Sequence, residues 1–226
     1  MKRQKVAMLL TLVGVLFSST QVFAAAPQPA NSTNQIEFTT NDNPTDPVDP
    51  TDPDNPNPPV DPTNPPTGNN GPLSIDSVPN IDFGINSIET KTVTYNAKNE
   101  NPFVQITDKR GSGAGWDLSA TITEFKTAQG DVLKGAELSF SNGQVKTVSS
   151  NTSNAPTAQD LIFANTASQP VMAAAKDDGQ GTWIDVWSGT KDNNSNVQLK
   201  VPVGSAKESV YTATITWTLS EGPVTP

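Results

Sequence analysis

The chain has 226 residues, with 14 Lys and Arg against 23 Asp and Glu, a net charge of −9, and neither histidine nor cysteine. Without cysteine, disulfide bonds, thiol catalysis and lipid attachment through a cysteine are excluded. Without histidine, the usual acid/base group near neutral pH and the commonest imidazole metal ligand are missing. Nucleic acid and anionic membranes are unfavourable partners, because binding to a phosphate backbone depends on a basic face.

Residues 1–24 have the layout of a secretory signal peptide. Three basic residues precede an apolar run over 6–17, and small residues follow around Ala24 and Ala26. The run is shorter than the roughly 20 residues of a membrane-spanning helix. We therefore expect cleavage after Ala24 or Ala26 and a secreted, extracellular product without membrane insertion. Cleavage removes three of the 14 basic residues and leaves 11 against 23 acidic ones, a net charge of −12.

An N-terminal strand segment is expected within residues 25–40. Residues 35–40 alternate apolar and polar side chains with a β-branched and aromatic bias, which is a short strand signal. Because an isolated strand is unstable in water, this one must pair with a sheet further along the chain. The alternative is a disordered tail.

A Pro/Asp-rich segment follows at residues 41–71. Asp-Pro recurs there four times, without one basic or aromatic residue. Proline fixes φ and lacks an amide donor, and like charges repel, so the segment is predicted to be an extended, solvated linker. If the preceding strand docks, the segment instead becomes a surface loop.

Residues 72–226 are long enough for one domain with its own core. Short strand-like segments follow one another, and no convincing amphipathic helix interrupts them. The predicted strands cover residues 73–78, 90–97, 103–107, 116–125, 136–140, 144–148, 161–164, 171–175, 182–187, 196–203 and 210–219. Asn142-Gly143 predicts a hairpin over 140–144, and 157–163 has a helical turn as its alternative. This pattern predicts an all-β, single β-sandwich-like domain.

Two predicted strands carry a Trp-x-Leu motif on an alternating apolar face. Trp116 and Leu118 share one face of the first strand, and Trp217 and Leu219 share one face of the second, where threonines fill the other face. Such a face normally belongs to the core, so we expect the four residues to be mainly structural. Direct contact of the tryptophans with a ligand is the alternative.

The contexts of both motifs resemble the WxL cell-wall-attachment family. The run 104–118, which ends in Trp116-Asp117-Leu118, looks like the first family motif, and 211–219, which ends in Trp217-Thr218-Leu219, is similar to the second. The stretch 73–79, Asp82-Phe83-Gly84 and the Asp-Pro tract also resemble family members. The resemblance implies a surface protein of low-GC Gram-positive bacteria that is held non-covalently to peptidoglycan. It also implies complexes with other WxL proteins and a membrane-anchored partner.

Two regions are candidate wall-binding sites. The Gly-rich loop at 109–115 contains adjacent cations that could hold carboxylates of wall peptides or anionic wall polymers, and its alternative is a plain strand connection. Trp183 and Trp187 share one face of a strand and could form a sugar-stacking platform, whereas a strand buried on both faces is the default. The candidate residues are Lys109, Arg110, Gly111, Gly113, Gly115, Trp183 and Trp187.

The resemblance thus implies a cell-surface module that binds peptidoglycan and joins surface complexes, and we expect it to act without catalysis, metal or cofactor. The alternative is a secreted carbohydrate-active enzyme or a lectin-like accessory domain. A glycosidase carboxylate pair cannot be identified from sequence, because only the separation of the two groups in space defines it.

Overall fold

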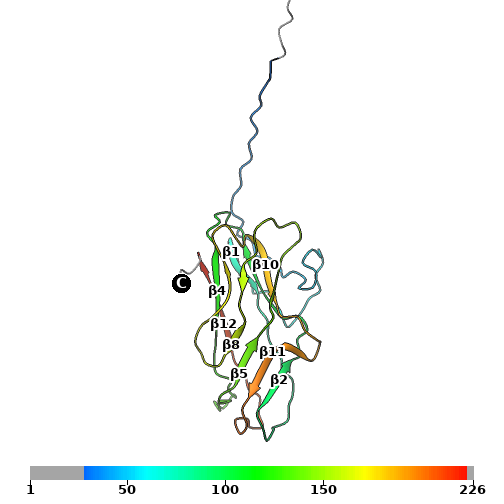
Figure 1. Ribbon diagram of the computed structural model, residues 1–226, viewed down its shortest axis with the longest axis vertical. Helices are drawn as coiled ribbons and strands as arrows, with labels where there is room; N and C mark the ends of the chain where they lie inside the picture. Colours follow the sequence, from blue (N-terminus) through cyan, green and yellow to red (C-terminus); the bar gives the residue numbers. More distant parts are fainter. Residues whose placement is uncertain (1–27, 223–226) are drawn as a thin grey trace, which may run out of the picture. The chain divides into compact units, whose positions relative to one another are not determined.

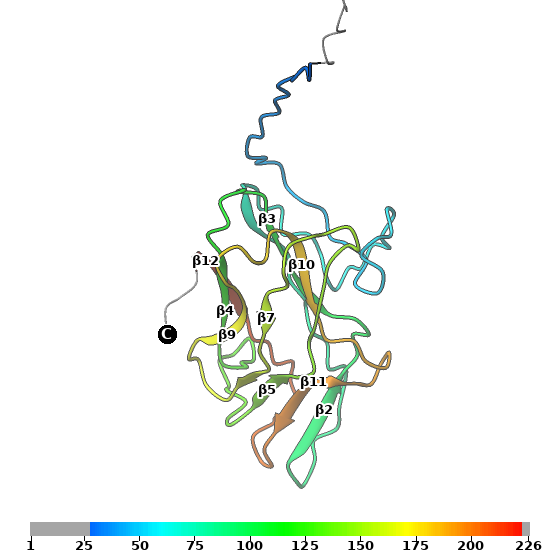
Figure 2. The same ribbon diagram turned by 45° about the horizontal axis from the view of Figure 1, so that its top comes forward.

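The computed structural model describes residues 28–222 as antiparallel strands joined by loops (Figures 1 and 2), and this part of the chain contains no helix. The expected signal peptide lies outside the described residues. Among the described residues, no helix is long and apolar enough to span a membrane. The strands are β1 (Leu73–Ser77), β2 (Val93–Ala97), β3 (Phe103–Asp108), β4 (Trp116–Ile122), β5 (Glu137–Phe140), β6 (Gln144–Lys146), β7 (Thr157–Ala158), β8 (Leu161–Phe163), β9 (Gln169–Ala174), β10 (Gly181–Val186), β11 (Asn194–Val201) and β12 (Ile215–Glu221).

These strands form three four-stranded sheets. Their orders are β1-β3-β10-β6 for sheet A, β2-β11-β5-β8 for sheet B and β12-β4-β9-β7 for sheet C. Figure 2 shows β4, β9 and β12 together, with β5, β11 and β2 in another part of the fold. The predicted all-β, sandwich-like architecture is confirmed, and each strand predicted from residue 73 onwards is present.

One local prediction is wrong, and one alternative does not apply. Residues 157–163 contain no helical turn, because Thr157 and Ala158 pair with β9 as strand β7. The predicted hairpin at Asn142-Gly143 does not form either, because β5 pairs within sheet B and β6 within sheet A. Asn142 does adopt a positive φ of 57°. The turn that it makes carries the chain from one sheet to another.

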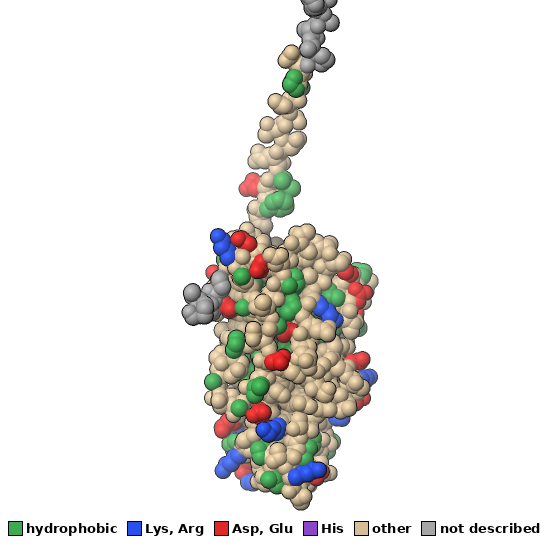
Figure 3. All heavy atoms as spheres, in the orientation of Figure 1, with side chains coloured by type: hydrophobic (Ala, Val, Ile, Leu, Met, Phe, Trp, Pro, Cys, Tyr) green, Lys and Arg blue, Asp and Glu red, His purple; other side chains and the backbone are tan. Residues whose placement is uncertain are grey.

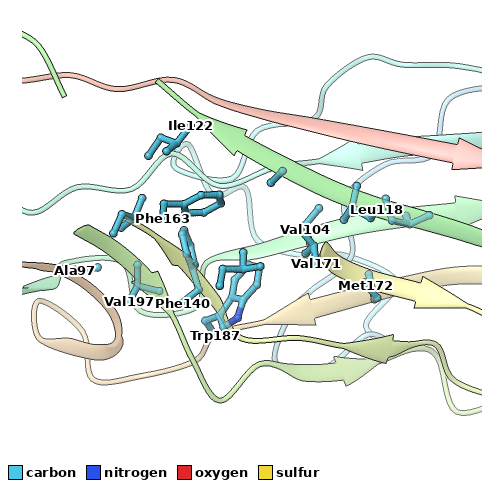
Figure 4. Packing of buried hydrophobic residues seen from close by; sticks show 14 of the residues in the cluster. Ala97, Val104, Leu118, Ile122, Phe140, Phe163, Val171, Met172, Trp187 and Val197 are labelled. Carbon is cyan, nitrogen blue, oxygen red and sulfur yellow. The ribbon is translucent and has the colours of Figure 1, made fainter. Parts of the chain in front are cut away.

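The main hydrophobic core lies between the sheets and draws side chains from all three. In β4, Trp116, Leu118, Ala120 and Ile122 are buried and alternate with half-buried residues, so one face of this strand is fully covered. Figure 4 shows Ile122 and Leu118 among side chains from the other strands, with Trp187 beside Phe140. With no disulfide available, this buried apolar area stabilises the fold.

The Pro/Asp-rich segment is not a solvated linker. It packs over the outer face of sheet A, where Val48 contacts a small cluster of Phe103, Ile184 and Val186. The Val48 amide donates a hydrogen bond to the Gln105 side chain at 2.8 Å. Further along, the Asn64 side chain is buried and donates to the Phe103 carbonyl at 2.8 Å, while the Phe103 amide donates to Asn64 Oδ1 at 3.0 Å.

Aspartate side chains shape this segment as a folded loop. Asp49 Oδ1 accepts hydrogen bonds from the amide and hydroxyl of Thr51, and Asp61 Oδ1 accepts the same pair from Thr63. Both are local turns in which a side chain replaces a backbone acceptor. The segment is therefore a folded surface loop. Docking of a preceding strand is not the reason, because residues 35–40 form no strand.

Thr39–Pro226 form one compact unit, and the described residues that precede it belong to a separate one. In that preceding unit, residues 28–38 form no strand, and the side chains of Ile36 and Phe38 are exposed.

Candidate functional site

The first Trp-x-Leu motif lies in the middle of sheet C. Strand β4 pairs with β12 on one side and β9 on the other, and both Trp116 and Leu118 are fully buried. The Trp116 indole Nε1 donates a hydrogen bond to the Gly179 carbonyl at 3.0 Å. This motif therefore fills the core and holds the 175–181 loop, and it presents no side chain to a ligand.

The second motif lies on β12, an edge strand of sheet C. Within the described chain β12 pairs only with β4, with Trp217 opposite Ala120 and Leu219 opposite Leu118. The side chains of Trp217 and Leu219 are half-buried. The Trp217 ring lies against the buried Trp187 ring, with a centroid distance of 6.4 Å and an interplanar angle of 32°.

The exposed part of Trp217 faces a groove of about 730 Å³. The apolar face of β12 and the 206–214 segment that precedes it form one wall, residues 78–88 form another, and Leu138 and Leu199 contribute from β5 and β11. Ile85, Ile88 and Val210 lie on its rim with exposed side chains. A groove that exposes apolar side chains beside polar ones is typical of an interaction site.

Aromatic and polar side chains are combined along this groove. Its aromatic residues are Phe83, Tyr95, Phe125, Tyr211 and Trp217. The Tyr95 hydroxyl donates to the Ser87 carbonyl at 3.3 Å, and the Tyr211 hydroxyl accepts the Lys207 amide at 3.0 Å, so both rings are fixed to the rim. Asn80, Asn86 and Ser209 add amide and hydroxyl groups. Flat apolar faces beside such groups suit sugar rings, which combine both surfaces.

One carboxylate, Asp82, is present among the residues that line the groove. On the opposite rim, Lys207 forms an exposed ion pair with Asp131, at 2.6 Å, and the hydrogen bond from this partner raises the pKa of the lysine. The face drawn in Figure 3 carries intermixed acidic and basic side chains. No strong field of one sign therefore marks that face.

The cations of the Gly-rich loop are engaged within the protein. Lys109 Nζ donates to the Asn43 carbonyl and to Thr45 Oγ1. Arg110 forms an ion pair with buried Asp108 at 2.7 Å and donates to the Gly115 carbonyl at 2.7 Å. Its hydrogen bond to Asp108 raises the pKa of Arg110. Both cations thus hold neighbouring loops, which leaves them poorly placed to bind an external anion.

The glycines of that loop allow a close approach of two segments. A Cβ on Gly113 would lie 2.5 Å from Asp177 Oδ1, and one on Gly115 would lie 2.4 Å from the Ala174 carbonyl oxygen. Gly111 also has a positive φ, of 66°, but nothing lies near it. Two of the three glycines therefore have a packing role.

Trp183 and Trp187 form no exposed platform. Both are buried, and β10 is covered on both of its faces. The Trp183 indole donates to the Gln180 carbonyl at 2.9 Å, next to the carbonyl that Trp116 holds. The default reading, a strand buried on both faces, is correct.

The loop held by these two indoles lines a small polar pocket. The pocket has a volume of about 310 Å³ and is bounded by 151–154, Asp177, Gln180 and Gly181. Its walls are amide, hydroxyl and carboxylate groups, without an aromatic face. This pocket is a second, weaker candidate surface.

Two carboxyl groups outside the predicted wall-binding residues are buried. Asp76 accepts hydrogen bonds from Ser74, Gln105 and Thr107, and burial nevertheless raises its pKa. Asp185 lies on the inward face of β10, and burial raises its pKa to about 7, with a smaller contribution from Asp160. The sequence signal for Asp185 was its position as a charged residue between Trp183 and Trp187 in an otherwise apolar strand.

Among the described residues, no group of three or more acidic side chains is placed to hold a metal ion. The family model described as WxL domain, surface cell wall-binding, matches residues 25–223. No curated protein and no solved structure matches the chain.

Proposed function

The chain belongs to the WxL family of surface cell wall-binding domains, and from this premise we propose that it attaches non-covalently to peptidoglycan through the groove beside β12. The supporting observation is the position of the second motif. Trp217 is half-buried, and its open side faces the groove, where tyrosine rings and amide groups are also present.

The groove is a better candidate than the other surfaces because its side chains are free to contact a ligand. Lys109 and Arg110 are held by internal partners, and the indoles of Trp183 and Trp187 are buried. Ile85 and Val210, by contrast, are both strongly exposed at the groove rim. Covering such residues with the apolar face of a glycan strand removes apolar area from water.

We propose binding without catalysis. Glycoside hydrolysis ordinarily uses two carboxyl groups on either side of the scissile bond. The described lining of the groove holds Asp82 as its one carboxylate. Incubation with purified peptidoglycan is expected to release no soluble muropeptides, and release of such fragments would favour the alternative of a carbohydrate-active enzyme.

Sedimentation of the mature protein with purified peptidoglycan tests the binding site. We expect the double variant Ile85→Ser/Val210→Ser to pellet several-fold less than the wild type, because both exposed apolar contacts are removed. Val60→Ser is the matched control, since Val60 is equally exposed but lies in the Pro/Asp-rich segment. Equal pelleting of the double variant and the wild type would show that the groove is not the contact surface.

The exposed rim also favours a second role as an interaction module for proteins. We propose that other WxL proteins and a membrane-anchored partner are candidates for this role, as the family resemblance implies. If the purified wild-type protein fails to pellet with peptidoglycan but pellets once such a partner is added, attachment occurs through the partner.

A further inference from the structure

Asp185 is an exception to the usual pairing of buried polar groups. Its side chain is fully buried on the inward face of β10, and neither carboxyl oxygen has a hydrogen-bond partner within the described chain. The buried Nε1 of Trp187, two residues further on, has none either. Buried Asp76, in contrast, accepts three side-chain hydrogen bonds. An unpaired buried polar group is costly, which makes its presence a reason to look for a role.

The two unpaired groups converge on the backbone of Gly143. A Cβ at this position would lie 2.4 Å from Asp185 Oδ1 and 2.9 Å from Trp187 Nε1. Gly143 does not have a positive φ, so its own backbone angles do not require glycine. What requires glycine here is the space that the carboxyl group and the indole N–H occupy.

The same indole supports the groove. The Trp187 ring packs against Phe140, with a centroid distance of 4.8 Å, as Figure 4 shows, and against Trp217 at 6.4 Å. Trp217 is the aromatic residue of the second motif and lines the groove. A shift of the Trp187 ring would therefore directly change the packing of Trp217, which lines the groove.

We propose that Asp185 and Trp187 form a proton-controlled pair that positions Trp217 and so makes the groove responsive to pH. A neutral carboxyl group can remain in the apolar interior, whereas a carboxylate needs a hydrogen-bond donor. Trp187 Nε1 is the buried unpaired donor beside it. Ionisation draws the indole toward Asp185 and away from its contact with Trp217. The effect on binding rests on the proposed function of the groove.

The surroundings of Asp185 oppose its ionisation. Burial raises its pKa to about 7, and the nearby Asp160 adds to the increase. On the neighbouring strands, Val145 of β6 and Val104 of β3 lie opposite Asp185 in the pairing register. The next residue on β6 is Lys146, whose Nζ donates to the Pro50 carbonyl. Among the described residues around Asp185, no cation therefore compensates a carboxylate.

The test is a pH titration of the mature protein followed by intrinsic tryptophan fluorescence and by peptidoglycan sedimentation. Asp185 goes from about one-tenth to about nine-tenths ionised between one pH unit below and one above its pKa. We expect a fluorescence transition centred near pH 7 and a change in the pelleted fraction of about twofold or more over the same range. Asp185→Asn, which is neutral and nearly isosteric, should give neither change.

Two further variants identify the cause. Trp187→Phe keeps an aromatic ring but removes the N–H, and it should abolish the transition in the remaining tryptophans. Asp160→Asn removes the negative neighbour and should move the transition to lower pH without abolishing it, because it lowers the pKa of Asp185. A wild-type signal that stays flat between about pH 5 and pH 9, or a transition that persists in Asp185→Asn, would overturn the proposal.

Failure of the proposed function gives a different result. If the fluorescence transition is present and is lost in Asp185→Asn, while no protein pellets at any pH, the proton-controlled pair is supported and the groove is not a wall-binding site. If the wild type pellets equally at every pH and its fluorescence is flat, the groove retains its proposed function and the pair is refuted.

Discussion

Strands β4 and β12 carry similar Trp-x-Leu patterns and are hydrogen-bonded neighbours, but they have different environments. Strand β4 has a partner on both sides, and its apolar face is fully buried. Strand β12 has β4 on one side, and its apolar face is half-buried along a groove. The position of a strand within its sheet, and not its sequence pattern, decides whether its tryptophan is fully buried or partly open to a groove.

Replacing the core tryptophan should have the largest effect on stability. Trp116→Ala removes a fully buried ring and the hydrogen bond to Gly179, so it should lower the free energy of unfolding by roughly 3–5 kcal/mol. Chemical denaturation measures this loss. Trp116→Phe keeps most of the buried area and should cost clearly less. A loss below about 1 kcal/mol for the alanine variant would remove the distinction between β4 and β12.

The second effect concerns the free energy of unfolding as a function of pH. The pKa of Asp185 is raised to about 7 in the folded state, from 3.8. The folded state then binds a proton that the unfolded state has lost, so stability decreases as pH rises from about 4 to about 7 and is constant above. The total is roughly 4 kcal/mol. Denaturation across this range should show the decrease in the wild type and not in Asp185→Asn. Parallel curves for the two proteins would refute the assignment.

Trp217→Ala should have a smaller effect on stability and a larger one on binding. Its side chain is already partly exposed, so we expect a loss of about 1–2.5 kcal/mol. At a temperature where the variant is folded, its sedimentation with peptidoglycan should nevertheless fall several-fold. A stability loss equal to that of Trp116→Ala would mean that β12 is as much part of the core as β4.

The smallest effect on stability belongs to the rim. Ile85→Ser/Val210→Ser should change the free energy of unfolding by about 0.5 kcal/mol or less, because both side chains are exposed. Thermal denaturation beside the Val60→Ser control measures this. A large loss would indicate that the rim closes over the groove and that reduced pelleting reflects unfolding.

The sequence was sufficient for most strands of the domain, because their alternation is strong in segments such as 116–122 and 215–221. The sequence was insufficient to predict which strands pair within a sheet. Asn142 has the positive φ expected of a hairpin turn, yet the strands on either side of it find partners in different sheets. Turn chemistry is local, whereas the choice of partner depends on which apolar faces meet in the core.

The candidate site could be predicted only in part, because the sequence shows the alternation within a strand but not the position of that strand in a sheet. From Tyr211 to Trp217, apolar residues alternate with threonines, which indicated an apolar face. Only the edge position of β12 leaves that face open. The composition of the Pro/Asp-rich segment is that of a linker and left the choice between linker and loop open. Its Asp49 and Asp61 organise turns, and its contacts with Gln105 and Phe103 come from a distant strand.

Hydrogen exchange of the mature protein, with and without soluble peptidoglycan fragments, locates the wall-binding surface. We expect the fragments to slow exchange in 78–88 and 206–217, which line the groove, and to leave β4 and the 109–115 loop unchanged. Slower exchange confined to 109–115 and 151–154 would contradict this and place wall contact at the other end of β4.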